Sequence, residues 1–115
     1  MSTKSMMLIA GLLIFGLTSV FAGGIKTEKI KVYGNCGMCK SRIEKAATSV
    51  KGVSKATWND ANTMLTVTFD EAMTTSLKIE EAVAGAGHDT DHAKATDKTY
   101  NALPACCKYE RPKKK

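Results

Sequence analysis

The sequence predicts a small α+β domain in which strands and helices alternate in the order β-α-β-β-α-β, followed by a short helical appendage. Two kinds of spacing support this fold class. Apolar residues alternate along residues 25–33 and 63–69, as they do on strands with one buried face. They recur every three or four residues along 39–50 and 79–86, as they do on helices with one buried stripe. A chain of 115 residues with one such set of core positions is expected to form a single small domain.

The first half of the chain supplies a strand, a helix and a hairpin. Residues 25–33 form the expected first strand, and a helix follows from about residue 39 to 50. Its apolar stripe consists of Cys39, Ile43, Ala46, Ala47 and Val50. Gly52 stands where a left-handed residue commonly ends a helix. Residues 53–59 and 63–69 then form a hairpin around a polar turn, with three residues facing inward: Leu65, Val67 and Phe69.

The second half supplies a helix, a weak strand and the appendage. Thr74, Thr75 and Ser76 are candidate N-caps of a helix whose outer face is expected to carry Glu80 and Glu81. Its inner stripe is Ile79, Ala82, Val83 and Ala86, and Gly87 is expected to end it. Residues 89–95 are a candidate edge strand, and a short helix from about 97 to 103 stops at Pro104. This order of elements is the split βαβ, or ferredoxin-like, arrangement.

The N-terminus has the features of a signal peptide. Lys4 provides a basic start, residues 8–17 form an apolar run too short to cross a membrane, and Val20 and Ala22 suit a signal-peptidase site. We expect cleavage near Ala22 and export, most simply to the periplasm; an uncleaved anchor is the alternative. The predicted organisation is therefore a signal peptide (1–22), a domain (23–95) and an appendage with a Cys-Cys pair and a basic tail (96–115).

Charge and motif content narrow the function classes. The formal net charge of +6 depends strongly on three terminal lysines, and no aromatic RNA-binding motif or basic recognition helix accompanies it. We therefore expect no nucleic-acid partner. No Ser/His/Asp set, acid–base pair or phosphate loop is present, so we expect no enzymatic turnover.

The chemistry-bearing stretch is the Cys-x-x-Cys of Cys36 and Cys39, where the first strand ends and the first helix begins. Cys36 is expected in the loop and Cys39 in the first helical turn, where unpaired N–H groups and the helix dipole favour thiolate. Lys40 and Arg42 add positive charge. A thiolate is both the nucleophile of disulfide exchange and a soft-metal ligand, so two function classes remain open.

From residue 30 to about 90 the chain resembles the heavy-metal-associated domain family of copper chaperones, metal-ATPase domains and the periplasmic mercury-binding protein. The resemblance is carried by the Cys-x-x-Cys, by Lys51-Gly52-Val53, and by the stretch 84–89, which looks like the family's Ala-Gly-Tyr ending. It implies a metal site at Cys36 and Cys39 that receives and hands on a soft ion by thiolate exchange. Cu(I) is the first choice, with Hg(II), Zn(II) and Cd(II) as alternatives.

The chain departs from the family pattern at two places. The family usually has Met two residues before the first Cys, whereas this chain has Gly34 there and Met38 between the cysteines, which predicts a less preformed loop. His88 replaces a common aromatic residue and is a candidate third ligand or hydrogen-bond donor to a thiolate; the alternative is an exposed loop histidine. His92 is a weaker candidate, because an i, i+4 pair with His88 would need a helix beyond Gly87.

Cys106 and Cys107 lie outside the region of resemblance. Adjacent cysteines seldom bridge each other. If the short helix folds back, one or both thiols complete a site with Cys36 and Cys39 or bind a second ion; otherwise they form a disulfide with the motif or stay free.

The main rival function is a thioredoxin-like oxidoreductase, since Cys-Gly-Met-Cys-Lys differs from the thioredoxin motif at one place. Against it, too few residues precede Cys36, neither proline stands where a cis-proline would face the disulfide, and Asn35 replaces the tryptophan. A structural disulfide protein is a third alternative. We therefore expect an exported, monomeric, soft-metal-binding protein whose partner is a membrane metal transporter or another metal-binding protein.

Overall fold

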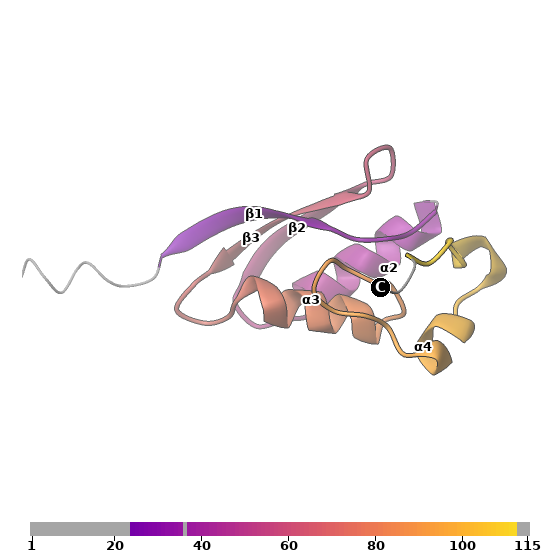
Figure 1. The fold of residues 1–115 in the computed structure, drawn as a ribbon. Coiled ribbons are helices and arrows are strands. Elements are labelled where there is room, and N and C mark those ends of the chain that lie inside the picture. The colour runs from indigo at the N-terminus through magenta and orange to yellow at the C-terminus, as the bar shows by residue number, and fades with distance from the viewer. Residues whose placement is uncertain (1–23, 36, 113–115) are drawn as a thin grey trace, which may run out of the picture.

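The computed structural model describes residues 24–35 and 37–112 of the chain. Within them, three antiparallel strands form one sheet: β1 (Ile25–Lys31), β2 (Val53–Asn59) and β3 (Met64–Asp70), in the order β1-β3-β2. The helices α2 (Gly37–Thr48) and α3 (Ser76–Gly85) lie side by side beneath the sheet (Figure 1). The C-terminal segment adds α4 (Asp97–Asn101) and the 3-10 turn η1 (Ala105–Cys107), which lie at one end of these layers.

The central strand β3 anchors the core. Leu65, Val67 and Phe69 are buried while the residues between them are half-buried, which confirms the predicted alternation. Leu65 is paired with Ile30 of β1 on one side and with Trp58 of β2 on the other. All three are buried, so they form an apolar row across the sheet against which α2 packs.

Helix α2 has the predicted apolar stripe and a polar link to β2. Cys39, Ile43 and Ala47 are buried in the core. On the flank of this stripe the Glu44 carboxylate accepts a hydrogen bond from the Trp58 backbone N–H at 2.8 Å and forms an ion pair with Lys40. These bonds fix the first half of α2 against the sheet, where the cysteine loop enters the helix.

Helix α3 confirms one prediction and corrects another. Thr75 is the N-cap, and its hydroxyl accepts a hydrogen bond from the Lys78 N–H at 3.2 Å. The expectation that Glu80 lies on the outer face is wrong, because Glu80 is only 3% exposed. Its carboxylate accepts hydrogen bonds from the Thr90 hydroxyl at 2.7 Å and the His92 N–H at 2.9 Å. The segment after α3 folds back and covers this side of the helix.

The expected edge strand over residues 89–95 is reduced to a single bridge between Val32 and Thr90. The Tyr33 N–H also donates to the Asp89 carbonyl at 2.9 Å, but the chain then turns, and the Thr90 N–H donates to the Ala93 carbonyl at 2.7 Å. With few apolar side chains to bury, this segment satisfies its backbone groups locally. The short helix ends at Asn101 rather than 103.

The predicted signal peptide, residues 1–22, lies outside the described residues. None of the helices in the described part of the chain is long and apolar enough to cross a membrane.

Candidate functional site

The Cys-x-x-Cys loop lies between β1 and α2, as predicted. Cys36 lies outside the described residues. Cys39 is in the first turn of α2 and is completely buried. Its sulfur accepts a hydrogen bond from the Asn35 backbone N–H at 3.3 Å. Cys39 therefore faces the core from a helix N-terminus, with a backbone N–H group directed at its sulfur.

The glycine at position 34 is explained by close packing under the loop. A Cβ atom at Gly34 would lie 3.2 Å from side-chain atoms of Cys39, Ile43 and Trp58. The Trp58 ring is itself fixed, because its Nε1–H donates to the buried Val32 carbonyl at 3.0 Å. The space beside Gly34, where the family usually has a methionine side chain, is thus filled in this chain by the Trp58 ring together with Cys39 and Ile43.

The C-terminal segment 104–111, which we call the C-terminal strap, brings two further thiols to this loop. Cys107 is completely buried and lies in the same core cluster as Cys39. Cys106 is exposed, with its sulfur 3.9 Å from the Cys107 sulfur and 3.5 Å from the Met38 sulfur. The C-terminal appendage therefore folds back onto the cysteine loop, which is the condition stated above for Cys106 or Cys107 to share a metal site with it.

The environment of Cys107 favours the neutral thiol in the metal-free protein. Burial, together with the hydrogen bond to Cys39 and the adjacent Cys106, raises the pKa of Cys107 to about 12. At neutral pH the Cys107 sulfur therefore carries its proton, and this proton has to leave before the sulfur becomes a metal ligand.

His88 is completely buried, so the exposed-loop alternative is wrong. Its Nδ1 lies 2.9 Å from the Tyr33 carbonyl oxygen, and its ring stacks on Tyr109 at a centroid distance of 5.4 Å. Burial lowers the pKa of His88, opposed by the Tyr33 carbonyl. The neutral ring then donates from Nδ1, because a carbonyl only accepts. Nε2 is left as a buried lone pair with no hydrogen-bond partner among the described residues.

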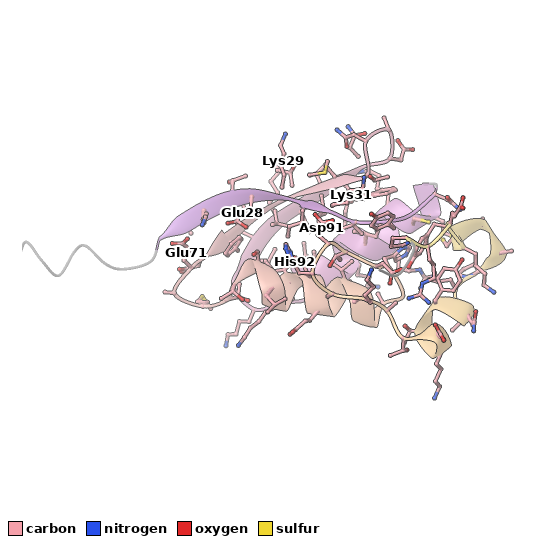
Figure 2. All side chains as sticks on the ribbon, viewed as in Figure 1. Glu28, Lys29, Lys31, Glu71, Asp91 and His92 are labelled. Atoms are coloured by element: carbon pink, nitrogen blue, oxygen red, sulfur yellow. The ribbon has the colours of Figure 1, made fainter. Side chains whose placement is uncertain are left out.

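His92 lies elsewhere. Its side chain is 72% exposed and its Nδ1 is 3.2 Å from Glu80. In Figure 2 it lies near α3, well away from the yellow C-terminal segment. The structure therefore groups Cys39, Cys106 and Cys107, and it leaves His92 apart from them.

Within residues 24–35 and 37–112, no group of three or more Cys, His, Asp and Glu side chains is arranged so that it could hold a metal ion. The Cys106 and Cys107 sulfurs lie 3.9 Å apart, and Cys36 is not among the residues that the structure describes.

The strap is held by a buried polar network that the sequence did not reveal. The Tyr109 hydroxyl donates to the Gly87 carbonyl at 2.7 Å and accepts from the Asp89 N–H at 2.8 Å. Arg111 contacts both oxygens of the buried Asp89 carboxylate at 2.9 Å. Asn35, next to Cys36 in sequence, donates through its side chain to the Lys108 carbonyl at 3.1 Å. The one available signal was Tyr109, an aromatic residue two positions after Cys107.

The ion pair of this network joins a buried carboxylate, Asp89, to a half-buried guanidinium, Arg111. Burial alone would raise the pKa of Asp89, but the Arg111 guanidinium and the Ala95 N–H hold it below its ordinary value. The same pair raises the pKa of Arg111. Burial also raises the pKa of the Tyr109 phenol, so its hydroxyl remains a donor at physiological pH.

The fold and the thiol loop together are those of a heavy-metal-binding module. The family model of the heavy-metal-associated domain matches residues 35–89. The chain is 32% identical to the "Mercuric transport protein periplasmic component" of Pseudomonas aeruginosa, over 70% of this chain and 90% of that protein. The chain belongs to the heavy-metal-associated domain family, which confirms the resemblance seen in its sequence.

Two larger relatives contain a similar region. They are a "Zinc-transporting ATPase" of Synechocystis, 33% identical over 63% of this chain, and "Copper-transporting ATPase 2" of Rhizobium meliloti, 35% identical over 67% of it. The matched region spans only 10% and 9% of these two proteins, respectively.

Solved structures confirm the fold class. Oxidized MerP from Ralstonia metallidurans CH34 is 33% identical over 59% of this chain and 96% of that chain, with a TM-score of 0.57. A structure of the "CopZ metallochaperone" is 30% identical over 56% of this chain and 98% of that chain, with a TM-score of 0.55. Each of these two structures covers little more than half of this chain.

Proposed function

We propose that this protein is an exported, non-enzymatic carrier that sequesters or delivers a soft metal ion, Cu(I) first among the candidates. The observation that carries the proposal is a family-type Cys-x-x-Cys loop whose second thiol, Cys39, is held at a helix N-terminus and accepts the Asn35 N–H. Cys36 and Cys39 are the proposed primary ligands. Cys106, Cys107 and His88 are candidates for additional ligation.

Cu(I) is proposed because soft thiolates at low coordination number suit it. Relatives named for copper, zinc and mercury all belong to the family, so Hg(II), Zn(II) and Cd(II) are the alternative cargoes. A periplasmic location is proposed from the N-terminal sequence, and the mercuric relative is named as a periplasmic component.

Delivery would proceed by ligand exchange. A thiolate of the partner attacks the bound ion, a three-coordinate intermediate forms, and one of the original metal–sulfur bonds breaks as the next partner bond forms. When the Cys39 sulfur leaves the metal, the Asn35 N–H is in place to donate a hydrogen bond to it. The proposed partner is a membrane metal transporter or a second metal-binding protein, since the relatives include metal-transporting ATPases.

The test is an anaerobic titration of the reduced protein with Cu(I) against a competing chelator. Cys36→Ser and Cys39→Ser should each abolish tight binding. Met73→Leu is the matched control, because Met73 is an exposed sulfur between β3 and α3, beyond the far end of α2. It should bind Cu(I) like the wild type. Chelator-resistant binding that survives both cysteine substitutions would refute the proposed site.

The rival function, thiol–disulfide exchange, makes a different prediction in the same samples. An oxidoreductase would show a Cys36–Cys39 disulfide that turns over with a dithiol substrate, and it would not compete with the chelator for Cu(I). That combination would replace the carrier proposal.

A further inference from the structure

We propose that Cys107 is a third thiolate ligand of the soft-metal site, built into the same chain and presented to Cys39 by the C-terminal strap. This inference rests on the proposed function and deepens it. It concerns a residue that lies outside the region matched by the family model.

Proximity is the first step. Cys107 lies in the same buried core cluster as Cys39, and η1 contacts α2, although 68 positions separate the two cysteines in the sequence. Both side chains are completely buried. A soft ion bound to the Cys39 sulfur would therefore have a second sulfur nearby, that of Cys107, which is shielded from solvent.

Preorganisation is the second step. Cys107 follows Pro104 in η1, and two residues later Tyr109 is fixed by its hydrogen bonds to Gly87 and Asp89. On the other side, the side chain of Asn35, the residue that precedes Cys36, donates a hydrogen bond to the Lys108 carbonyl. The strap is thus attached by protein hydrogen bonds both to the core and to the cysteine loop, so little ordering entropy opposes ligation by Cys107.

Ligation by Cys107 is chemically balanced. Its S–H bond breaks, a metal–sulfur bond forms and the proton passes to solvent, with no change of oxidation state. Three thiolates suit trigonal Cu(I) and Hg(II), and they satisfy most of the demand of Zn(II) or Cd(II). Cys106 is the less suitable of the two adjacent residues, because it is exposed and its sulfur faces Met38.

A third internal ligand shifts the balance from delivery toward retention. A partner thiolate attacking a two-thiolate site finds an open coordination position, whereas the Cys107 sulfur would already occupy it. The wild type should therefore hold Cu(I) more tightly than Cys107→Ser, by more than about tenfold, since even a change in a residue that only orients a ligand commonly costs 10–100-fold. Release of Cu(I) to a two-thiolate acceptor should be slower by a similar factor.

The experiment counts sulfur ligands. The reduced protein is loaded with one equivalent of Cu(I), and separately of Cd(II), under anaerobic conditions. X-ray absorption gives the number of sulfur neighbours of copper, and the thiolate-to-cadmium charge-transfer band gives an independent count. Cys107→Ser and Cys107→Ala are compared with the matched control Cys106→Ser, and circular dichroism with urea denaturation establishes that each variant is folded.

We expect three sulfurs in the wild type and in Cys106→Ser, and two in folded Cys107 variants. Two sulfurs in the wild type, or a count that Cys107→Ser leaves unchanged, would overturn the inference while leaving the carrier function intact. The loss of a sulfur in Cys106→Ser but not in Cys107→Ser would also overturn it. A wild type that binds neither ion would refute the proposed function itself. The count in the wild type decides the question even if both Cys107 variants fail to fold.

Discussion

Replacing Tyr109 by phenylalanine tests whether the C-terminal strap is part of the folded domain. The substitution keeps the ring, which stacks on His88 and meets Tyr100 edge-on at 5.0 Å. It removes only the hydroxyl, which pairs with the Gly87 carbonyl and the Asp89 N–H. Both of these backbone groups belong to buried residues, so water cannot easily replace the lost partner.

The expected cost follows from these two bonds. Each net hydrogen bond contributes about 1 kcal/mol, and buried groups left unsatisfied add a desolvation penalty, so we expect a loss of about 2–3 kcal/mol in the free energy of unfolding. For a domain of this size that corresponds to a fall in Tm of roughly 10–20 °C.

Tyr100→Phe is the matched control. The Tyr100 hydroxyl donates one hydrogen bond, to the Tyr109 carbonyl at 2.6 Å, at a half-buried site. We expect a loss of about 1 kcal/mol. Urea and thermal denaturation of the metal-free protein give both values. If Tyr109→Phe costs no more than Tyr100→Phe, the strap is not part of the cooperative unit and our account of how Cys107 is held is wrong.

Three further predictions concern stability. Arg111→Met should lower the free energy of unfolding by about 2–3 kcal/mol at pH 7. In the wild type the depressed pKa of Asp89 contributes stability above pH 3.8, the ordinary pKa of the carboxyl, and this contribution is lost as the pH falls through the lower pKa of the folded state. The urea midpoint of the variant should therefore depend less on pH in this acidic range than that of the wild type. Gly34→Ala should cost about 1–3 kcal/mol by overpacking, whereas Gly85→Ala, where a Cβ meets nothing within 4 Å, should be neutral or stabilising by up to about 1 kcal/mol; equal effects would contradict the packing account. Glu80→Leu should cost about 1–3 kcal/mol in urea denaturation, because it orphans buried donors, and a neutral result would show that Glu80 is not the buried acceptor described here.

The sequence predicted best the elements that are specified locally. The hairpin of β2 and β3 and the stripe of α2 follow from periodicity, because each residue's burial depends on which face of its own element it occupies. The same reasoning failed at Glu80. Its position on α3 is on the outer face by spacing, but a segment that comes later in the chain covers it, and helical periodicity contains no information about that segment.

For the candidate site, the sequence predicted where the loop lies, and it left open whether Cys106 and Cys107 would reach that loop. The contact between Cys39 and Cys107 depends on the path of the strap, which is set by nonlocal bonds from Tyr109 and Arg111. His88 was identified by its place in the family pattern, yet its burial follows from the aromatic ring of Tyr109 stacked over it. The ligand roles of all these residues, Cys36 included, stay predictions.

The shortened edge strand and the position of the strap have a common cause at Asp89. Its backbone carbonyl accepts the Tyr33 N–H just beyond β1, next to the single bridge between Val32 and Thr90. Its carboxylate accepts the Ala95 N–H at 2.7 Å and the Arg111 guanidinium, and its N–H is taken by the Tyr109 hydroxyl. A longer strand would carry residue 95 along the sheet, away from this carboxylate. The bond from Asp89 to Ala95 thus keeps the segment from continuing along the sheet, and its bonds to Tyr109 and Arg111 hold the strap that brings Cys107 back to the cysteine loop.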